Sequence, residues 1–268
     1  MEREPRTRFE IAVLVLVVVL AVVSIAMHLH PVVGEKKLPW VWIVPVFFAF
    51  CLCHACFALG WRRAVTLLGI TTVITFGAEY IGTTTGLLFG DYTYDPVVGY
   101  LVLGEVPYTI PMAWFTMLYA SYIVTNLIID GKPVSDGWGG GKLVWLSFIG
   151  AMIMTAWDLT LDPYMVEFEH GWTWNEGGPY FGIPYSNYTG WIGVSFLVFV
   201  LYRLAEIKIE QRPLGHVTWW IVLIPLLTYG QMSAADIALG HPEETVLISP
   251  FAMGIPFLIA LSRLAVWK

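Results

Sequence analysis

Long apolar runs recur along the whole chain, separated by shorter polar or glycine-rich segments. Each run has about twenty residues, the length at which an α-helix crosses the hydrocarbon core of a membrane. We expect an all-α integral membrane protein, a bundle of about eight transmembrane helices with two long outer loops, forming a single transmembrane domain over 1–268. The predicted spans are 10–29, 40–59, 64–82, 107–129, 143–161, 190–207, 216–238 and 247–266.

The first apolar run follows Arg3, Arg6 and Arg8, an arrangement that secretory signal peptides also have. The run from Ile11 to Met27 is long enough to cross a bilayer. We therefore interpret it as the first membrane helix.

Positive residues fall mainly on one side of the predicted bundle. Only Lys36 and Lys37 lie on the other side. Because Lys and Arg are enriched in cytoplasmic segments, we expect a multi-pass protein of the cell membrane with both termini in the cytoplasm. The cytoplasmic residues would be Arg3, Arg6, Arg8, Arg62, Arg63, Lys132, Lys142, Arg203, Lys208, Arg212, Arg263 and Lys268.

The segments expected on the outer side are acidic. Residues 83–106, 162–189 and 239–246 contain no Lys or Arg, and the first two are long and rich in Gly, Pro, Tyr and Trp. Long loops without a domain of their own are usually functional. We expect these two loops to fold back over the bundle as caps.

Composition limits the classes of function. Of the 268 residues, 57% are hydrophobic and 13% are charged, too few charges to cover a soluble surface of this size. The net charge of −6 offers no basic face, so we expect no nucleic acid partner. Every Lys lies in a predicted loop, at a helix edge or at the terminus, which argues against a retinal pigment bound as a Schiff base.

The three cysteines lie together as Cys51, Cys53 and Cys56, with His54 between them. A zinc site would need further ligands, and no second ligand cluster stands elsewhere in the chain. The group falls in the middle of a predicted span, where free cysteine behaves as a small buried hydrophobic residue. We expect no metal site.

Three carboxylates lie inside predicted spans: Glu79, Asp158 and Asp236. An ionisable group is costly in hydrocarbon, so each is a functional candidate, although each could instead be a helix-end residue that reaches water. Glu79 follows Arg63 by sixteen residues and Asp158 follows Lys142 by sixteen. Both should therefore stand roughly 24 Å from the cytoplasmic edge. Asp236 is expected at a similar or slightly higher level, so the three would share one layer.

Asp158 has a close companion in Asp162. The two are four residues apart, which places them on one helical face unless Pro163 ends the helix at Asp162. Two carboxylates held close in a low dielectric do not both ionise readily. One of them is thus expected to keep its proton at neutral pH, as an alkene-protonating acid must.

The two long loops lead into the following helices in a similar way. The first passes through Pro107-Tyr108 and soon reaches Trp114, and the second passes through Asn187-Tyr188 and soon reaches Trp191. This similarity suggests a weak internal repeat around 64–130 and 143–207, as in bundles built from two related halves. The same aromatic residues could instead be membrane-interface anchors.

Several motifs between about residues 70 and 195 resemble one known family. They are Gly77-Ala78-Glu79, Thr83 to Gly86, Phe89 to Tyr94, Val106 to Trp114, Trp157 to Pro163, Trp172-Thr173-Trp174, and Tyr180 to Trp191. The chain here is similar to the carotenoid biosynthesis membrane protein family that contains the CruF-type carotenoid hydratases, including haloarchaeal bisanhydrobacterioruberin hydratases.

The resemblance implies addition of water to a terminal isopropylidene double bond of an acyclic C40 or C50 carotenoid, giving a tertiary alcohol. The expected conversion is bisanhydrobacterioruberin to bacterioruberin. The carotenoid and membrane lipid would be partners, and other carotenoid biosynthesis enzymes are further candidates.

Hydration of such an alkene requires a protonated carboxyl, an aromatic pocket for the tertiary carbocation, one water and a base, and no cofactor. We expect a cofactor-independent hydro-lyase in which Asp158, paired with Asp162, is the leading acid and Glu79 is its rival. Asp236 is a further candidate. Residues that could hold water are Asp91, Asn187, Tyr94 and Tyr188, and residues that could face the cation are Trp114, Trp157, Tyr185 and Trp191.

Three other functions remain open from the sequence. A carotenoid cyclase would make the same cation but quench it by ring closure. A proton-coupled transporter would use Glu79, Asp158 and Asp236 as a relay, but transport sites usually lie near mid-membrane, and we expect no basic partner inside the spans. A non-catalytic scaffold would bind carotenoid without turnover.

Overall fold

The computed structural model describes residues 8–33, 38–135, 139–211 and 217–267. Within these residues, eight helices are long and apolar enough to cross a membrane, which confirms the predicted all-α bundle. Seven of them are α1 (Arg8–Val33), α2 (Trp40–Leu59), α3 (Trp61–Thr85), α4 (Thr109–Asp130), α5 (Gly140–Tyr164), α6 (Tyr185–Glu206) and α7 (Trp219–Leu239). The eighth joins α8 (Thr245–Ser249), the π-helical turn η4 (Pro250–Gly254) and α9 (Ile255–Val266).

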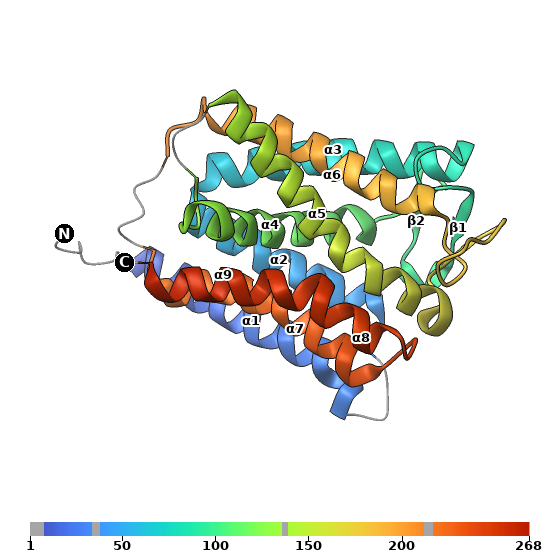
Figure 1. The fold of residues 1–268 in the computed structure, drawn as a ribbon. Helices are drawn as coiled ribbons and strands as arrows, with labels where there is room; N and C mark the ends of the chain where they lie inside the picture. Colours follow the sequence, from blue (N-terminus) through green and yellow to red (C-terminus); the bar gives the residue numbers. More distant parts are fainter. Residues whose placement is uncertain (1–7, 34–37, 136–138, 212–216, 268) are drawn as a thin grey trace.

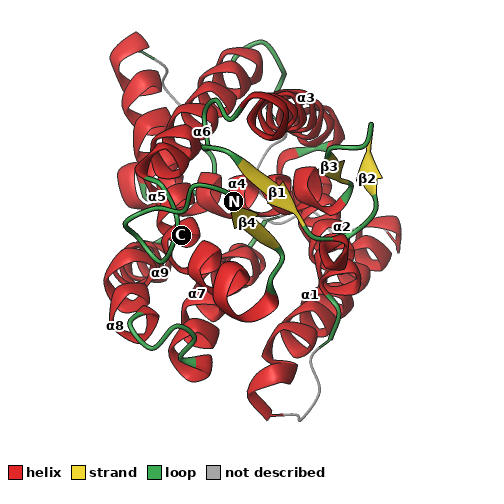
Figure 2. Ribbon diagram, turned by 90° about the vertical axis from the view of Figure 1, so that its right-hand side faces the viewer, coloured by secondary structure: helices red, strands yellow, loops and turns green. Residues whose placement is uncertain are grey.

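Helix α4 stands at the centre of the bundle and is buried along most of its length. The other spans form a closed ring around it in the order α1, α2, α3, α6, α5, α8–α9 and α7 (Figures 1 and 2). A helix surrounded by other helices must satisfy its polar side chains internally. Thr116 and Thr125 do so by donating to the backbone carbonyls of Met112 at 2.9 Å and Ser121 at 2.6 Å.

The two long loops are joined by a small antiparallel sheet. Strand β1 (Tyr92–Tyr94) pairs with β4 (Trp172–Trp174), with Tyr92 opposite Trp174 and Tyr94 opposite Trp172. Because successive strand residues point to opposite faces, all of these aromatic side chains share the face toward the bundle, and the intervening threonines are exposed. The loops thus form the expected caps, and we call this end of the bundle the sheet end (Figure 2).

The remainder of the first loop is also ordered. It contains the short 3₁₀ helix η1 (Pro96–Val98) and a second hairpin of β2 (Leu101–Val102) and β3 (Val106–Pro107). In the second loop, the π-helical turn η2 (Met165–Glu169) continues α5 toward β4. The chain therefore reaches β1 by a short loop after α3 and reaches β4 shortly after η2.

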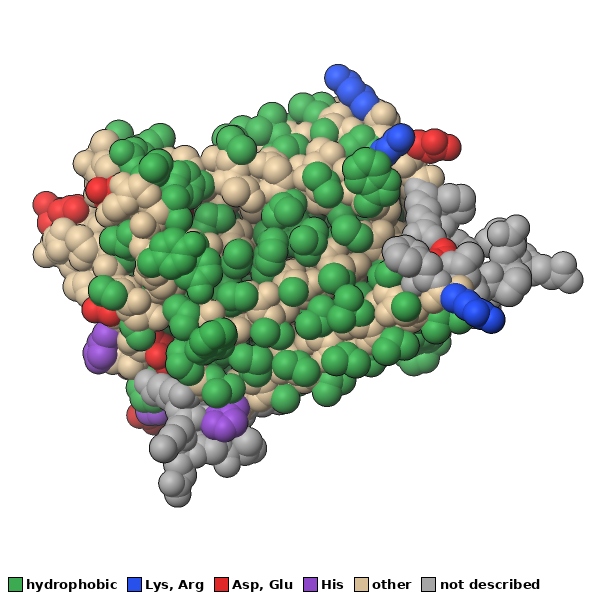
Figure 3. All heavy atoms as spheres, turned by 180° about the vertical axis from the view of Figure 1, so that it is seen from behind, with side chains coloured by type: hydrophobic (Ala, Val, Ile, Leu, Met, Phe, Trp, Pro, Cys, Tyr) green, Lys and Arg blue, Asp and Glu red, His purple; other side chains and the backbone are tan. Residues whose placement is uncertain are grey.

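Charged side chains are distributed unequally between the two ends of the molecule. Histidine and many acidic side chains lie at the sheet end, Lys and Arg lie at the other end together with some acidic side chains, and a broad apolar belt lies between the two ends (Figure 3). The orientation in the membrane stays a prediction. It rests on the positions of Lys and Arg, and some of these lie outside the described residues: Arg3, Arg6, Lys36, Lys37, Arg212 and Lys268.

The expectation that no basic partner lies inside the spans was wrong. Arg63 in α3 and Arg203 in α6 are both buried. Arg63 Nη1 donates to Glu206 Oε1 at 2.9 Å, and Tyr122 Oη donates to the same oxygen at 2.5 Å. Arg203 Nη2 donates to Asn126 Oδ1 at 3.0 Å. These basic residues lie near helix ends, and their long side chains turn inward because Glu206 and Asn126 offer acceptors there.

Candidate active site

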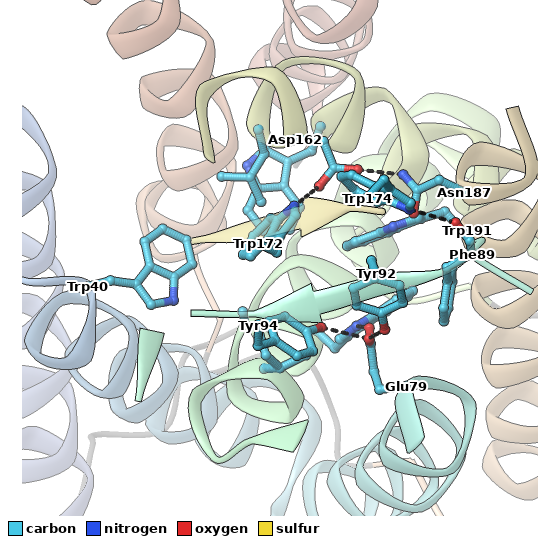
Figure 4. A pocket seen from close by; sticks show the side chains of 15 residues that line it. Trp40, Glu79, Phe89, Tyr92, Tyr94, Asp162, Trp172, Trp174, Asn187 and Trp191 are labelled. Atoms are coloured by element: carbon cyan, nitrogen blue, oxygen red, sulfur yellow. Dashed lines mark hydrogen bonds between the residues drawn. The ribbon is translucent and has the colours of Figure 1, made fainter. Parts of the chain in front are cut away.

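A partly open pocket lies beneath the sheet, among the sheet-end portions of α3, α4, α5 and α6. Its cavity volume is about 40 Å³, and most of its lining is aromatic. Glu79 and Asp162 reach the pocket from opposite sides (Figure 4). The residues that line it are Trp40, Glu79, Phe89, Tyr92, Tyr94, Ile110, Ala113, Trp114, Trp157, Leu161, Asp162, Trp172, Trp174, Asn187 and Trp191.

Glu79, from α3, accepts hydrogen bonds from three side chains. Tyr92 Oη and Tyr94 Oη both donate to Oε2, the latter at 2.6 Å, and Trp114 Nε1 donates to Oε1 at 2.8 Å. Three donors converging on one carboxyl group match a carboxylate, which only accepts hydrogen bonds. The arrangement therefore fits a fixed negative charge in the pocket.

The two tyrosines come from β1, where their spacing of two places both on the inner face. Burial away from water and the adjacent Glu79 carboxylate raise the pKa of Tyr92 and of Tyr94 well above the usual value of 10.0. Both hydroxyl groups therefore stay protonated at neutral pH and remain donors to Glu79.

Glycines allow the first loop to approach the helices this closely. A Cβ atom at Gly190 of α6 would lie 2.6 Å from the Leu88 carbonyl oxygen. A Cβ atom at Gly82 of α3 would lie 3.2 Å from Tyr92 Oη. Larger residues at these positions would push β1 away from the bundle and Tyr92 away from Glu79.

On the other side of the pocket, Asp158 and Asp162 form what we call the aspartate pair. Helix α5 continues through Pro163 to Tyr164, so both carboxyl groups share one helical face and are almost fully buried. Asn187 Nδ2 donates to Asp158 Oδ2 at 3.0 Å and also to Asp162 Oδ2. Trp172 Nε1 donates to Asp162 Oδ1 at 3.1 Å.

The two carboxyl groups of the aspartate pair lie side by side, because one amide nitrogen of Asn187 contacts an oxygen of each. Two buried carboxyl groups held this close do not both ionise readily. Asp162 lines the pocket, whereas Asp158 lies behind it. The arrangement can thus hold a proton next to the cavity.

Aromatic rings connect the two sides. Trp114 of α4 and Trp191 of α6 are stacked, with ring centroids 4.0 Å apart and planes inclined by 14°. Trp157 of α5 meets Trp191 edge-on, at 6.0 Å and 77°. Trp114 and Trp191 occupy equivalent positions in the predicted internal repeat. The repeat itself stays a prediction.

Four residues that the sequence nominated lie elsewhere. Asp91 is exposed immediately before β1 and does not line the pocket, and Tyr185 is 69% exposed at the start of α6. Tyr188 packs edge-on against Tyr180, close to the aspartate pair but outside the pocket lining. Asp236 accepts a hydrogen bond from Ser249 Oγ at 3.1 Å, between α7 and α8.

Sequence reasoning did not select Tyr92, Trp172 and Trp174 as site residues. Their signal is the alternation Tyr-Thr-Tyr and Trp-Thr-Trp, which is typical of a strand with one buried face. Each motif is only three residues long, and neither alone indicates a partner strand. Their pairing places the aromatic residues of both loops over one pocket.

Near the cysteines, His54 is buried and makes contacts at both ring nitrogens, with Tyr119 Oη at 2.6 Å from Nδ1 and the Ile221 carbonyl oxygen at 2.9 Å from Nε2. It links α2, α4 and α7. Among the residues that the structure describes, no three His, Cys, Asp or Glu side chains are placed to hold a metal ion.

Comparison with known proteins gives two matches. Residues 40–261 match the family described as "Carotenoid biosynthesis protein". A relative from Haloarcula japonica, named "Bisanhydrobacterioruberin hydratase", is 30% identical over 136 residues. That alignment covers 51% of this chain and 43% of the relative, so the chain matches less than half of the relative's length. No solved structure matches the chain.

Proposed function

The chain belongs to the carotenoid biosynthesis protein family, and from that premise we propose that it is a carotenoid hydratase. It adds water across a terminal isopropylidene double bond of an acyclic C40 or C50 carotenoid. The name of the Haloarcula japonica relative supports bisanhydrobacterioruberin as the substrate and bacterioruberin as the product. Membrane lipid surrounds the bundle and delivers the apolar substrate.

The observation that carries the proposal is the aspartate pair held by one amide beside an aromatic pocket. Asn187 Nδ2 binds both carboxyl groups, and Trp172 fixes the remaining oxygen of Asp162. When two buried carboxyl groups share one proton, one of them remains a carboxylic acid at neutral pH and the other is a carboxylate. Protonation of an unactivated alkene needs such an acid.

Asp162 donates the proton, because it lines the pocket and Asp158 does not. The proton adds to the less substituted carbon of the double bond, whose electron pair forms the new C–H bond. The other carbon becomes a tertiary carbocation. Asp158 holds the orientation and protonation of Asp162, so in this proposal the leading role belongs to Asp162 rather than to Asp158.

The carbocation is stabilised by ring faces and by a fixed charge. Trp114, Trp157 and Trp191 present aromatic rings to the pocket, and cations are attracted to such faces. Glu79, saturated by three donors, supplies a negative charge that does not need to take up a proton. Glu79 thus acts as a counter-ion rather than as the rival acid.

Water then completes the reaction. Its oxygen forms a bond to the tertiary carbon, and the proton that it loses returns to the Asp162 carboxylate. The net change is the addition of one water to one double bond, and the aspartate pair regains its starting state. This cycle needs no external acid, base or cofactor.

The size of the cavity sets a condition on substrate binding. A volume of about 40 Å³ has room for a few water molecules but not for a branched alkene end. Side chains that line the pocket must therefore move outward when the carotenoid end enters. The sheet end faces the outside of the cell in this proposal, because Lys and Arg gather at the opposite end.

The test is expression of the full chain in cells that accumulate an acyclic carotenoid, followed by mass analysis of the pigments. A mass gain of one water for each modified end is expected. An Asp162→Asn variant present in the membrane at the same level is the matched control and should leave the substrate unchanged. A product of unchanged mass would indicate a cyclase, and bound but unaltered pigment would indicate a scaffold; either result would overturn the proposal.

A further inference from the structure

A second cavity lies beside the sheet, next to the residues that precede β1 and follow β4. Its volume is about 630 Å³, and its lining is mainly polar. We call it the polar recess; the polar side chains that line it are Thr83, Thr84, Thr85, Asp91, Glu176 and Ser186. Hydroxyl and carboxylate groups that face an open space of this size hold water rather than apolar ligands.

The polar recess and the pocket lie next to each other, because adjacent residues of the chain line one or the other. Gly90 lines the recess while the preceding Phe89 lines the pocket, and Ser186 lines the recess while the following Asn187 lines the pocket. Thus the amide that holds the aspartate pair is the direct neighbour of a recess residue.

Trp174 is the one residue, among those the structure describes, that lines both spaces. Its indole is buried, and its Nε1 donates to the Phe89 carbonyl oxygen at 2.9 Å. Gly90 packs against this indole, since a Cβ atom there would lie 3.2 Å from Trp174 Cδ1. The Trp174 side chain is therefore part of the wall between the polar recess and the pocket, where it also packs against Tyr92 with ring centroids 5.7 Å apart.

Hydration consumes one water in each cycle, and most of the pocket is lined by aromatic rings, which hold water poorly. Water cannot be supplied readily through the apolar belt that faces lipid. We propose that the polar recess is the water route of the enzyme and that Trp174 controls passage into the pocket. This inference rests on the proposed hydratase function. Asp91 then lies at the mouth of the water route rather than at the reacting bond.

One test blocks the recess chemically. In a background with Cys51, Cys53 and Cys56 replaced by alanine, Ser186→Cys is labelled with a negatively charged, membrane-impermeant methanethiosulfonate. Labelling should lower hydration by about tenfold or more, and reduction of the mixed disulfide should restore it. Thr173→Cys, exposed on the outer face of β4 and outside the recess, is the matched control and should stay within about twofold.

A second test measures how fast a thiol reagent reaches the pocket and does not depend on enzyme activity. Ala113→Cys places a thiol in the pocket lining, where the same reagent should react slowly. Replacing Trp174 by alanine should raise that labelling rate by about tenfold. Trp172→Ala is the control, because Trp172 is a buried indole of the same strand that lines the pocket but not the recess.

The outcomes separate the two proposals. Absence of hydrated product from the unlabelled, otherwise wild-type protein would overturn the hydratase function. Normal hydration that is equally fast with Ser186→Cys labelled and unlabelled would overturn the water route and leave the function standing. Equal labelling of Ala113→Cys in the Trp174 and Trp172 variants would also overturn the role of Trp174.

Discussion

Trp114 and Trp191 stack face to face with ring centroids 4.0 Å apart, and this contact joins the two sides of the pocket. The Trp114 indole donates to Glu79 at 2.8 Å, whereas Trp191 meets Trp157 from the helix that carries the aspartate pair. The stacked rings thus lie between Glu79 and the aspartate pair. In the proposed mechanism, Glu79 and Asp162 both act on a cation held in this pocket.

The two tryptophans differ in one testable way, because only Trp114 donates to Glu79 in the structure. Trp114→Phe keeps a stacked ring but removes this hydrogen bond, which is of the kind worth about 1.5–3 kcal/mol when one group is charged. We expect hydration to fall by about tenfold or more. Trp191→Phe, measured by the same pigment assay at matched protein level, should lose less. The reverse order would argue against Glu79 as counter-ion.

The aspartates should differ in their effect on rate. Asp162→Asn removes the proton donor and should reduce hydration by about 10² to 10⁴-fold, the usual range for a general acid. Asp158→Asn leaves a donor that is wrongly oriented, and a smaller loss is expected. Rates measured in isolated membranes with added carotenoid would check this. Equal losses would place both groups at the reacting bond.

Glu79→Gln tests the fixed charge. The substitution keeps the size of the side chain but replaces a carboxylate oxygen by an amide nitrogen that donates, so either the two tyrosines or Trp114 face a second donor. Loss of the negative charge should slow formation of the cation by about 10²-fold or more. Substrate binding, measured by pigment that co-purifies with the protein, should be retained. Unchanged hydration would rule out this role.

The tyrosines over Glu79 predict a dependence of stability on alkaline pH. The folded pKa of Tyr92 and Tyr94 lies above the usual 10.0, so their contribution to stability is complete below that pH and is lost as pH rises through the folded value. The unfolding temperature in detergent should therefore fall above about pH 10. A Tyr92→Phe, Tyr94→Phe double variant should unfold at a lower temperature than the unsubstituted protein at pH 8. Its unfolding temperature should then fall less than that of the unsubstituted protein when the pH is raised. An identical decrease in both proteins would contradict this.

The buried ion pair at the other end should affect stability but not chemistry. Glu206→Ala leaves Arg63 buried without its carboxylate partner, which typically costs about 3–5 kcal/mol. The unfolding temperature should drop, while hydration per folded molecule stays within about twofold. A loss of activity in protein that is shown to be folded would instead connect this end of the bundle to the reaction.

Several features follow from the sequence by local periodicity. Apolar runs of membrane-spanning length predicted the eight helices, and a spacing of four residues predicted that Asp158 and Asp162 share a face. Both inferences need only the geometry of a single helix. Glu79 was found in the same way, because a carboxylate inside an apolar run is conspicuous.

Other features depended on contacts between distant segments. The pairing of β1 with β4, the binding of both aspartates by Asn187, and the exclusion of Asp91 and Asp236 from the pocket have no local signature. They result from how helices and loops pack, which sets the direction of each side chain. The sequence by itself thus determined which helices cross the membrane and which carboxylates they carry. Only the tertiary structure decided which of those carboxylates meet, because a periodic pattern specifies a face but not the partner that covers it.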